Sequence, residues 1–453
     1  MFYSLSLPLL PLAAATEAEN APIILTAVLL NLVVIYLASK IGGEVCKRLD
    51  FPPVLGELLA GVLVGVSALH LLVFSESGAT ASDSLIMSVL QAINGLNPDV
   101  LTNIFESQSE VISVLAELGV ILLLFEIGLE SDLRQLAEVG YQATIVACVG
   151  VVVPFVAGTA GLMLWFHIPA IPAIFAGAAL TATSIGITSK VLSELGQLKS
   201  KEGQMIVGAA IIDDILGIIV LAVVASLAKT GEVDIVNVIY LIISATAFLI
   251  GAIFLGRFLN KSFVAIVNKL QTRGQLVIPA LTFAFFMAFL ANAIHLEAIL
   301  GAFAAGLVLE ETDERKILDE QIIPIADILV PIFFVTVGAK ADLGVLNPVL
   351  PSNREGLVIA AFLMVVAILG KVITGWSVFG QPGINRLAIG VGMIPRGEVG
   401  LVFAGIGSAS GVLSKSLDAA IIIMVILTTF LAPPFLRIAF GRSEKVPETT
   451  STR

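Results

Sequence analysis

Long apolar segments separated by short polar ones fill most of the chain. A helix needs about 20 mainly apolar residues to cross the hydrocarbon core of a bilayer. By this criterion we predict about thirteen membrane-spanning helices. They lie at about 23–40, 52–70, 112–130, 141–166, 170–193, 204–228, 236–258, 275–295, 298–310, 325–339, 356–378, 386–409 and 417–438. The pattern is typical of an all-α polytopic membrane protein.

One of these segments contains two adjacent carboxylates, Asp213 and Asp214, near its middle. A single acidic side chain at the centre of a membrane helix costs about 2.5–3.5 kcal/mol on insertion scales. The two acids must therefore face protein or water, and they predict a site for protons or cations. The alternative is that they only cap a packed helix. It is disfavoured because the apolar run from Met205 to Leu227 continues on both sides.

Composition agrees with a membrane protein. Of the 453 residues, 58% are hydrophobic and 13% are charged, and the mean hydropathy is +1.04. The net charge of −11 and the lack of a basic run argue against nucleic-acid binding. The two cysteines, Cys46 and Cys148, show no metal-ligand spacing and do not suggest a disulfide framework.

The positions of Lys and Arg predict the orientation of the chain. With the N-terminus outside, four of the 24 Lys and Arg residues fall on the outer side and two fall inside spans. The others lie on the cytoplasmic side, in agreement with the excess of Lys and Arg that cytoplasmic loops of membrane proteins carry. Residues 1–22 form either an outer tail or a signal-like segment, and residues 441–453 form a cytoplasmic tail.

The order of the spans suggests an internal repeat. If the seventh span is a linker helix, spans one to six and eight to thirteen form two six-helix halves of opposite orientation. Inverted repeats of this kind recur in secondary transporters. We therefore predict two inverted six-helix repeats.

Spans five and twelve each contain residues that loosen a helix. Span five holds Thr183 and Ser184 in LTATSIG, and span twelve holds Arg396 and Glu398 in GMIPRGEVG. Unwound backbone at membrane depth occurs only beside a cavity or inside protein. We therefore predict two discontinuous helices, although close packing through small residues is the alternative for span five. An unpaired Arg is costly in a membrane, so we expect Arg396 to pair with Glu398.

Six short sequences stand in one order along the chain. They are PVLGELLAG at 53–61, FEIGLE at 125–130, the aspartate pair, GAFAAG at 301–306, PIFF at 331–334 and PRGE at 395–398. In this combination the chain resembles the monovalent cation:proton antiporters, specifically the bacterial branch with a paired-aspartate motif. It is similar to the sodium/proton antiporters of cyanobacteria.

The resemblance implies a homodimer and a division of the membrane domain, residues 23–440, into two parts. The dimer domain would comprise residues 23–130 and 275–339, and the ion-carrying core would comprise residues 141–228 and 356–438. The two discontinuous helices would cross in the core. We expect monovalent cations, protons and the lipid bilayer as partners, and no cofactor.

The resemblance also assigns roles to single residues. Asp214 would bind the cation, Na⁺, and the proton, and Asp213 would pair with a membrane-embedded lysine, which matches Lys371. Snorkelling of Lys371 towards the cytoplasmic face is the alternative. Thr183 and Ser184 are candidate ligands, because small hard cations favour oxygen donors.

These features predict a secondary transporter that exchanges Na⁺, or also Li⁺ or K⁺, for H⁺ by alternating access, with net charge movement. A short potassium/proton exchanger is the second hypothesis. An intramembrane aspartyl enzyme is the third, and it is disfavoured because neighbouring helix residues point about 100° apart and cannot share a proton. The membrane would be a bacterial plasma membrane or, in a cyanobacterium, a thylakoid membrane.

Overall fold

The computed structural model describes residues 10–77, 79–230, 235–248, 251, 272–310, 312, 314–343, 351–381, 383–397, 400, 403, 407 and 411–441. Within these ranges the regular elements are helices, without a strand. The longer ones are α1 (Leu10–Arg48), α4 (Pro98–Glu130), α5 (Leu133–Trp165), α8 (Lys201–Thr230), α12 (Arg315–Ala339), α13 (Pro351–Val372) and α16 (Lys415–Phe440). The shorter ones are α2 (Pro53–Val64), α3 (Leu85–Asn94), α6 (Ala170–Ala179), α7 (Ile185–Glu194), α10 (Val277–Ala293), α11 (Ala298–Glu310) and α14 (Arg386–Gly392). Single turns of 3₁₀ helix are η1 (Ser75–Ser77), η2 (Ala81–Asp83) and η4 (Ile373–Ser377).

The prediction of an all-helical membrane protein is confirmed. Seven helices in the described part of the chain are long and apolar enough to cross a membrane, and further apolar helices are shorter. Several helices run beyond the apolar segments that predicted them. For example, α12 begins at Arg315, ten residues before the predicted start, and α4 begins at Pro98 instead of about residue 112. Helical hydrogen bonding continues where the sequence is polar, so hydropathy marks the membrane-embedded part of a helix and not its ends.

One helix was not predicted. The predicted spans leave residues 71–111 without a helix, yet this segment contains α3. The hydroxyl of Ser84 accepts a hydrogen bond from the backbone N–H of Met87 at the start of α3, and Gly95 adopts a left-handed conformation at its end. Both are ordinary helix start and stop signals.

The chain divides into two compact units, which are described separately. The first unit comprises Met1–Val45, Gly56–Gly119 and Ile328–Asp342. Its helices pack closely through glycine: a Cβ atom added at Gly61 would collide with the Val335 carbonyl on α12, and one added at Gly338 would collide with the Leu58 carbonyl on α2. Close backbone approach through small residues is the usual packing of membrane helices.

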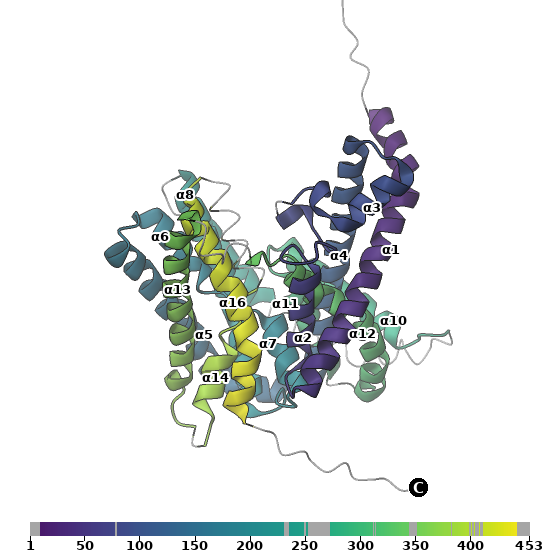
Figure 1. Ribbon diagram of the computed structural model, residues 1–453. Helices are drawn as coiled ribbons and strands as arrows, with labels where there is room; N and C mark the ends of the chain where they lie inside the picture. Colours follow the sequence, from purple (N-terminus) through teal and green to yellow (C-terminus); the bar gives the residue numbers. More distant parts are fainter. Residues whose placement is uncertain are drawn as a thin grey trace, which may run out of the picture. The chain divides into compact units, whose positions relative to one another are not determined.

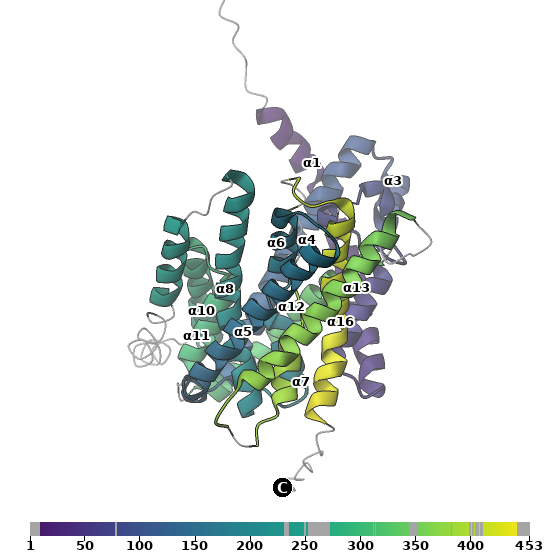
Figure 2. The same cartoon turned by 90° about the vertical axis from the view of Figure 1, so that its left-hand side faces the viewer.

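The second unit comprises Cys46–Leu55, Val120–Asp327 and Leu343–Arg453. In it α13 and α16 lie side by side (Figure 1), and α5 packs against both α8 and α13 (Figure 2). The buried core of these helices includes Leu162, Phe175, Leu363, Phe403 and Met424. This core includes Ala179 and Leu180, which lie at the first predicted helix break.

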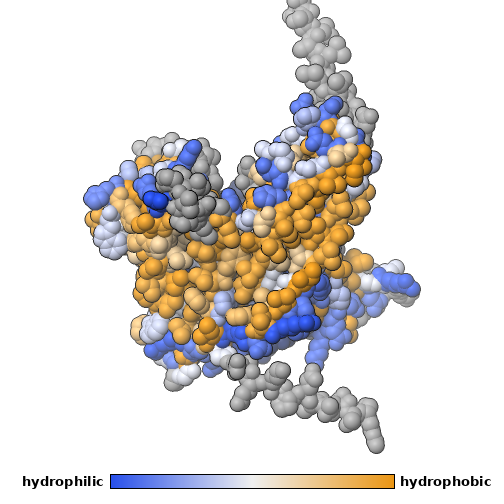
Figure 3. All heavy atoms as spheres, viewed as in Figure 1, coloured by the Kyte–Doolittle hydropathy of each residue, from blue (hydrophilic) through white to orange (hydrophobic). Residues whose placement is uncertain are grey.

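The outer faces of the long helices are apolar. Leu25, Val33 and Leu37 on α1 and Val358 and Val365 on α13 all expose more than half of their surface. Figure 3 shows hydrophobic residues along both helices. Exposed aliphatic surface of this extent marks a region that is covered by another apolar phase, which for this chain is lipid.

Candidate ion-binding site

The aspartate pair lies in the middle of α8. Between Gly203 and Ala228 the helix carries no charged residue except Asp213 and Asp214, and both are buried, with 0% and 3% exposure. Successive residues on a helix point about 100° apart. The two carboxylates therefore meet different neighbours.

Asp213 contacts Lys371, which lies in the last turn of α13. The Lys371 ammonium donates to both carboxylate oxygens, at 3.3 Å to Oδ1 and 3.2 Å to Oδ2. Both side chains are fully buried. Lys371 thus points into the protein instead of snorkelling to the cytoplasmic face, as the alternative reading of the sequence allowed.

The first helix break separates α6 from α7. α6 ends at Ala179, residues 180–184 are not helical, and α7 begins at Ile185. The second break follows α14, which ends at Gly392, and residues 393–397 are not helical. Both discontinuities fall where glycine, proline and hydroxyl residues predicted them.

Hydrogen bonds join the two breaks. The backbone N–H of Ser184 donates to the Pro395 carbonyl at 2.8 Å, and the Thr183 hydroxyl donates to the Met393 carbonyl at 3.1 Å. The Thr188 hydroxyl, one turn into α7, donates to the Gly392 carbonyl at 3.0 Å. Carbonyls that the second break releases from the helical ladder are thus satisfied by the first.

Arg396 binds the ends of both half-helices. Its guanidinium donates to the Leu180 carbonyl, just after α6, at 2.6 Å and to the Met393 carbonyl, just after α14, at 3.3 Å. The side chain is fully buried. Unpaired carbonyls give a helix C-terminus a partial negative charge, which a cation stabilises.

The expected partner of Arg396, Glu398, lies outside the described residues. The pairing of these two charges stays a prediction. The sequence did not predict that Arg396 donates hydrogen bonds to backbone carbonyls at the ends of two helices. One of them, the Leu180 carbonyl, lies 216 positions away in the chain.

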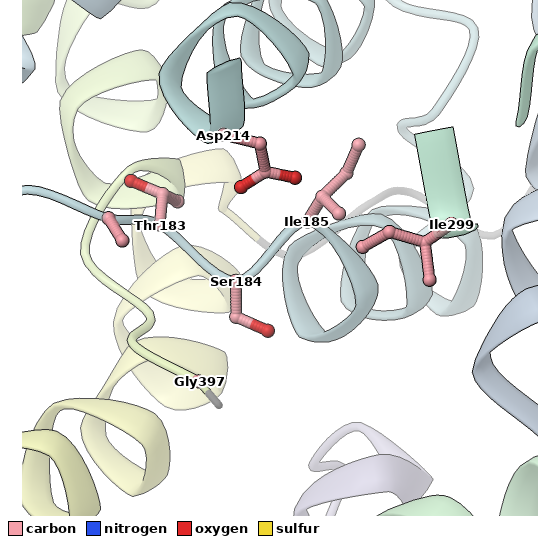
Figure 4. A pocket seen from close by; sticks show the side chains of 7 residues that line it. Thr183, Ser184, Ile185, Asp214, Ile299 and Gly397 are labelled. Atoms are coloured by element: carbon pink, nitrogen blue, oxygen red, sulfur yellow. The ribbon is translucent and has the colours of Figure 1, made fainter. Parts of the chain in front are cut away.

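A cavity lies between the breaks and α8. Its lining consists of Ala182, Thr183, Ser184, Ile185, Asp214, Ile299 and Gly397. In Figure 4 the Asp214 carboxylate points towards the unwound segment that carries Thr183 and Ser184. A carboxylate beside hydroxyl and backbone oxygens is a donor set that suits a small hard cation.

The structure therefore brings most of the predicted site residues together. Asp214, Thr183 and Ser184 line one cavity, and Asp213, on the adjoining position of α8, faces Lys371. Ile299 of α11 and Gly397 were not singled out as lining residues. Gly397 stands inside the PRGE sequence, but only the fold shows that it reaches the cavity.

Residues 28–440 match the family described as "Sodium/hydrogen exchanger, transmembrane". The chain belongs to this family. The exchanger is 62% identical over 443 residues to the high-affinity Na⁺/H⁺ antiporter NhaS3 of Synechocystis. The alignment covers 97% of this chain and 96% of NhaS3. It is 32% identical to the Na⁺/H⁺-K⁺ antiporter GerN of Bacillus cereus, with 92% and 97% of the two chains covered.

A solved structure shares the fold of the exchanger. The sodium proton antiporter MjNhaP1 from Methanocaldococcus jannaschii, at pH 8, matches with a TM-score of 0.60 and 15% identity. The match covers 91% of this chain and 96% of that one. The exchanger fold thus agrees with the architecture expected from the sequence.

Proposed function

We propose that the protein exchanges Na⁺ for H⁺ across a membrane by alternating access, with Asp214 binding the cation and the proton in turn. One observation carries the proposal. Asp214 is a buried carboxylate that lines a cavity between two broken helices, while the adjacent Asp213 is engaged by Lys371. A carboxylate in this position can neutralise either ion but not both fully.

The neighbouring oxygens supply the rest of the proposed site. Thr183 donates its hydroxyl proton to the Met393 carbonyl, which leaves the oxygen lone pairs of Thr183 available as an acceptor. Ser184 lines the same cavity. Both would act as cation ligands beside Asp214.

The choice of cation is supported by the relatives. NhaS3 is named as a Na⁺/H⁺ antiporter, and GerN as a Na⁺/H⁺-K⁺ antiporter. Na⁺ is therefore the proposed substrate and K⁺ the alternative. Because Asp213 and Asp214 face different neighbours, the structure offers little support for an aspartyl dyad.

The proposal extends to assembly and location. We infer a homodimer in which residues 23–130 and 275–339 form the dimer domain and residues 141–228 and 356–438 form the core. The excess of Lys and Arg on one side supports an outer N-terminus and a cytoplasmic C-terminus. A bacterial plasma membrane and a thylakoid membrane are both compatible with the sequence.

The test is ion flux in vesicles that contain the purified protein. A Na⁺ gradient should drive proton movement, seen with a pH-sensitive dye, and Li⁺ and K⁺ gradients give the selectivity. Asp214→Asn should abolish the flux, since an amide keeps the shape but has no exchangeable acidic proton and no negative charge. The control is Asp99→Asn at an exposed position of α4. Flux at the wild-type rate in Asp214→Asn would refute the assignment.

A further inference from the structure

Gly397 lies against Ser184 at the cavity wall. A Cβ atom added at Gly397 would stand 2.9 Å from the Ser184 hydroxyl oxygen and 3.0 Å from the Ser184 Cβ atom. These distances are shorter than van der Waals contact between such atoms. A side chain at position 397 and the present position of Ser184 are therefore incompatible.

The main chain of Ser184 is tied to the second break. Its backbone N–H is bonded to the Pro395 carbonyl, two residues before Gly397. In Figure 4 Ser184 stands between Gly397 and Asp214. A displacement of Ser184 away from Gly397 and towards Asp214 would narrow the cavity that these three residues line.

We propose that Gly397 sets the width of the ion cavity, through Ser184, and thereby its preference among alkali cations. The inference rests on the proposed function, because it concerns the same site. Because glycine has no side chain at position 397, Ser184 can pack against Gly397 and away from Asp214. Larger cations need that room more than smaller ones do.

The chain offers a matched control. Gly217 lies on α8 three residues after Asp214, and a Cβ atom added there would make an ordinary contact of 3.7 Å with Ala182. Gly217→Ala therefore adds the same methyl group close to the same cavity without displacing a neighbour. It separates an effect of crowding from a general effect of losing a glycine.

The experiment measures the apparent KM for Li⁺, Na⁺ and K⁺ in vesicle flux. In Gly397→Ala the ratio of the KM for Na⁺ to that for Li⁺ should rise about tenfold, the scale on which one methyl group discriminates between substrates. If K⁺ is also transported, the ratio of the KM for K⁺ to that for Li⁺ should rise by a larger factor. In Gly217→Ala both ratios should equal those of the wild type.

Ser184→Gly tests the same idea from the other side of the contact. It removes both crowded atoms and widens the cavity, so the ratios should fall. With those atoms gone, the nearest Ser184 atom to an added Cβ is the Cα, at 3.8 Å. The double variant Gly397→Ala with Ser184→Gly should therefore show the ratios of Ser184→Gly alone.

Three results would overturn the inference. The first is an active Gly397→Ala protein whose ratio of KM for Na⁺ to KM for Li⁺ equals that of the wild type. The second is a Gly397→Ala substitution that changes this ratio as much in the Ser184→Gly background as in the wild type. If Gly397→Ala does not fold, Ser184→Gly alone is the test. The third result is then a Ser184→Gly protein whose KM ratio is not lower than that of the wild type. A wild-type protein that exchanges none of these cations would instead refute the proposed function.

Discussion

Lys371 reaches Asp213 through a space that depends on the absence of a side chain at Gly150. A Cβ atom added at Gly150, on α5, would lie 3.2 Å from the Lys371 ammonium nitrogen and 3.5 Å from its Cδ atom. Lys371 is fully buried and bonded to both oxygens of Asp213. Its ammonium cannot yield without lengthening those bonds.

Gly150→Ala should therefore destabilise the protein. Overpacking of a buried site costs about 1–3 kcal/mol. The control is Gly140→Ala on the same helix, where an added Cβ atom has no neighbour within 4 Å and the better helix propensity of alanine gains up to about 1 kcal/mol. Melting temperatures in detergent should thus move in opposite directions. In a Lys371→Ala background the two alanine variants should behave alike.

At the scale of elements, Arg396 holds the C-terminal ends of α6 and α14 together. Arg396→Met leaves the Leu180 and Met393 carbonyls without this donor, and hydrogen bonds that involve a charged group contribute about 1.5–3 kcal/mol each. We expect a loss of about 3 kcal/mol or more in detergent stability. Arg386→Met, at an exposed position of α14, should stay within about 0.5 kcal/mol of the wild type.

The same assay tests the predicted pairing of Arg396 with Glu398. If the two charges pair, Glu398→Gln should also lower the melting temperature, and the double variant should lose less than the sum of the two single losses. A Glu398→Gln protein with wild-type stability and no ion flux would make Glu398 a transport residue instead.

A contact between Lys340 and Glu76 in the first unit gives a pH-dependent prediction. The Lys340 ammonium bonds to Glu76 in η1, donates to the Ser113 hydroxyl at 3.3 Å and lies 5.3 Å from the centre of the Phe74 ring. Burial alone would raise the pKa of Glu76, but Lys340, through its hydrogen bond and charge, and Ser113 hold that pKa below its ordinary value of 4.5.

Because the pKa of Glu76 is lowered in the folded state, its stabilisation is present above pH 4.5 and is lost as the pH falls through the folded-state pKa. Glu76 is half exposed, so the pair contributes about 0.2–1 kcal/mol. Lys340→Met should lower the melting temperature slightly at pH 7, and the difference should shrink as the pH falls below 4.5 and through the folded-state pKa of Glu76. A difference that does not change with pH would mean that packing on Phe74, and not the charge, is responsible.

Some elements of the site were predictable because their signals are local. The acids in an apolar helix and the glycine, proline and hydroxyl residues of the two breaks violate the rules for a continuous membrane helix at the positions themselves. The partners of those residues were not predictable from local rules. The Leu180 carbonyl that binds Arg396, the clearance at Gly150 and the approach of Gly397 to Ser184 depend on contacts between distant segments.

The helix α3 shows a different limit. Its cap residues Ser84 and Gly95 are visible in the sequence, but the helix has only ten residues and is too short to count as a membrane-spanning segment. Hydropathy identifies what lies in lipid. It does not identify short helices outside it.

At the scale of the whole molecule, the paired aspartates predict the charge moved in each cycle. If opening the site breaks the contact between Lys371 and Asp213, one of the two can change protonation in addition to Asp214. Two protons would then cross against one Na⁺. A Na⁺ step on a solid-supported membrane, without a pH gradient, should give a sustained current. Asp213→Asn should retain flux with little charge movement.

A wild-type protein that exchanges ions but does not respond to an imposed membrane potential would contradict this stoichiometry. The control for Asp213→Asn is again Asp99→Asn, which should leave both flux and current unchanged. Equal loss of flux in Asp213→Asn and Asp214→Asn would show that the two carboxylates do not divide their roles.

The bond between the Ser184 N–H and the Pro395 carbonyl has a consequence for how such proteins diverge. It joins the two breaks through main-chain atoms, which every residue except proline supplies at position 184. A junction of this kind can persist while the side chains around it are substituted. In a search for distant relatives, the places where proline is forbidden should be more informative than the identities of the side chains.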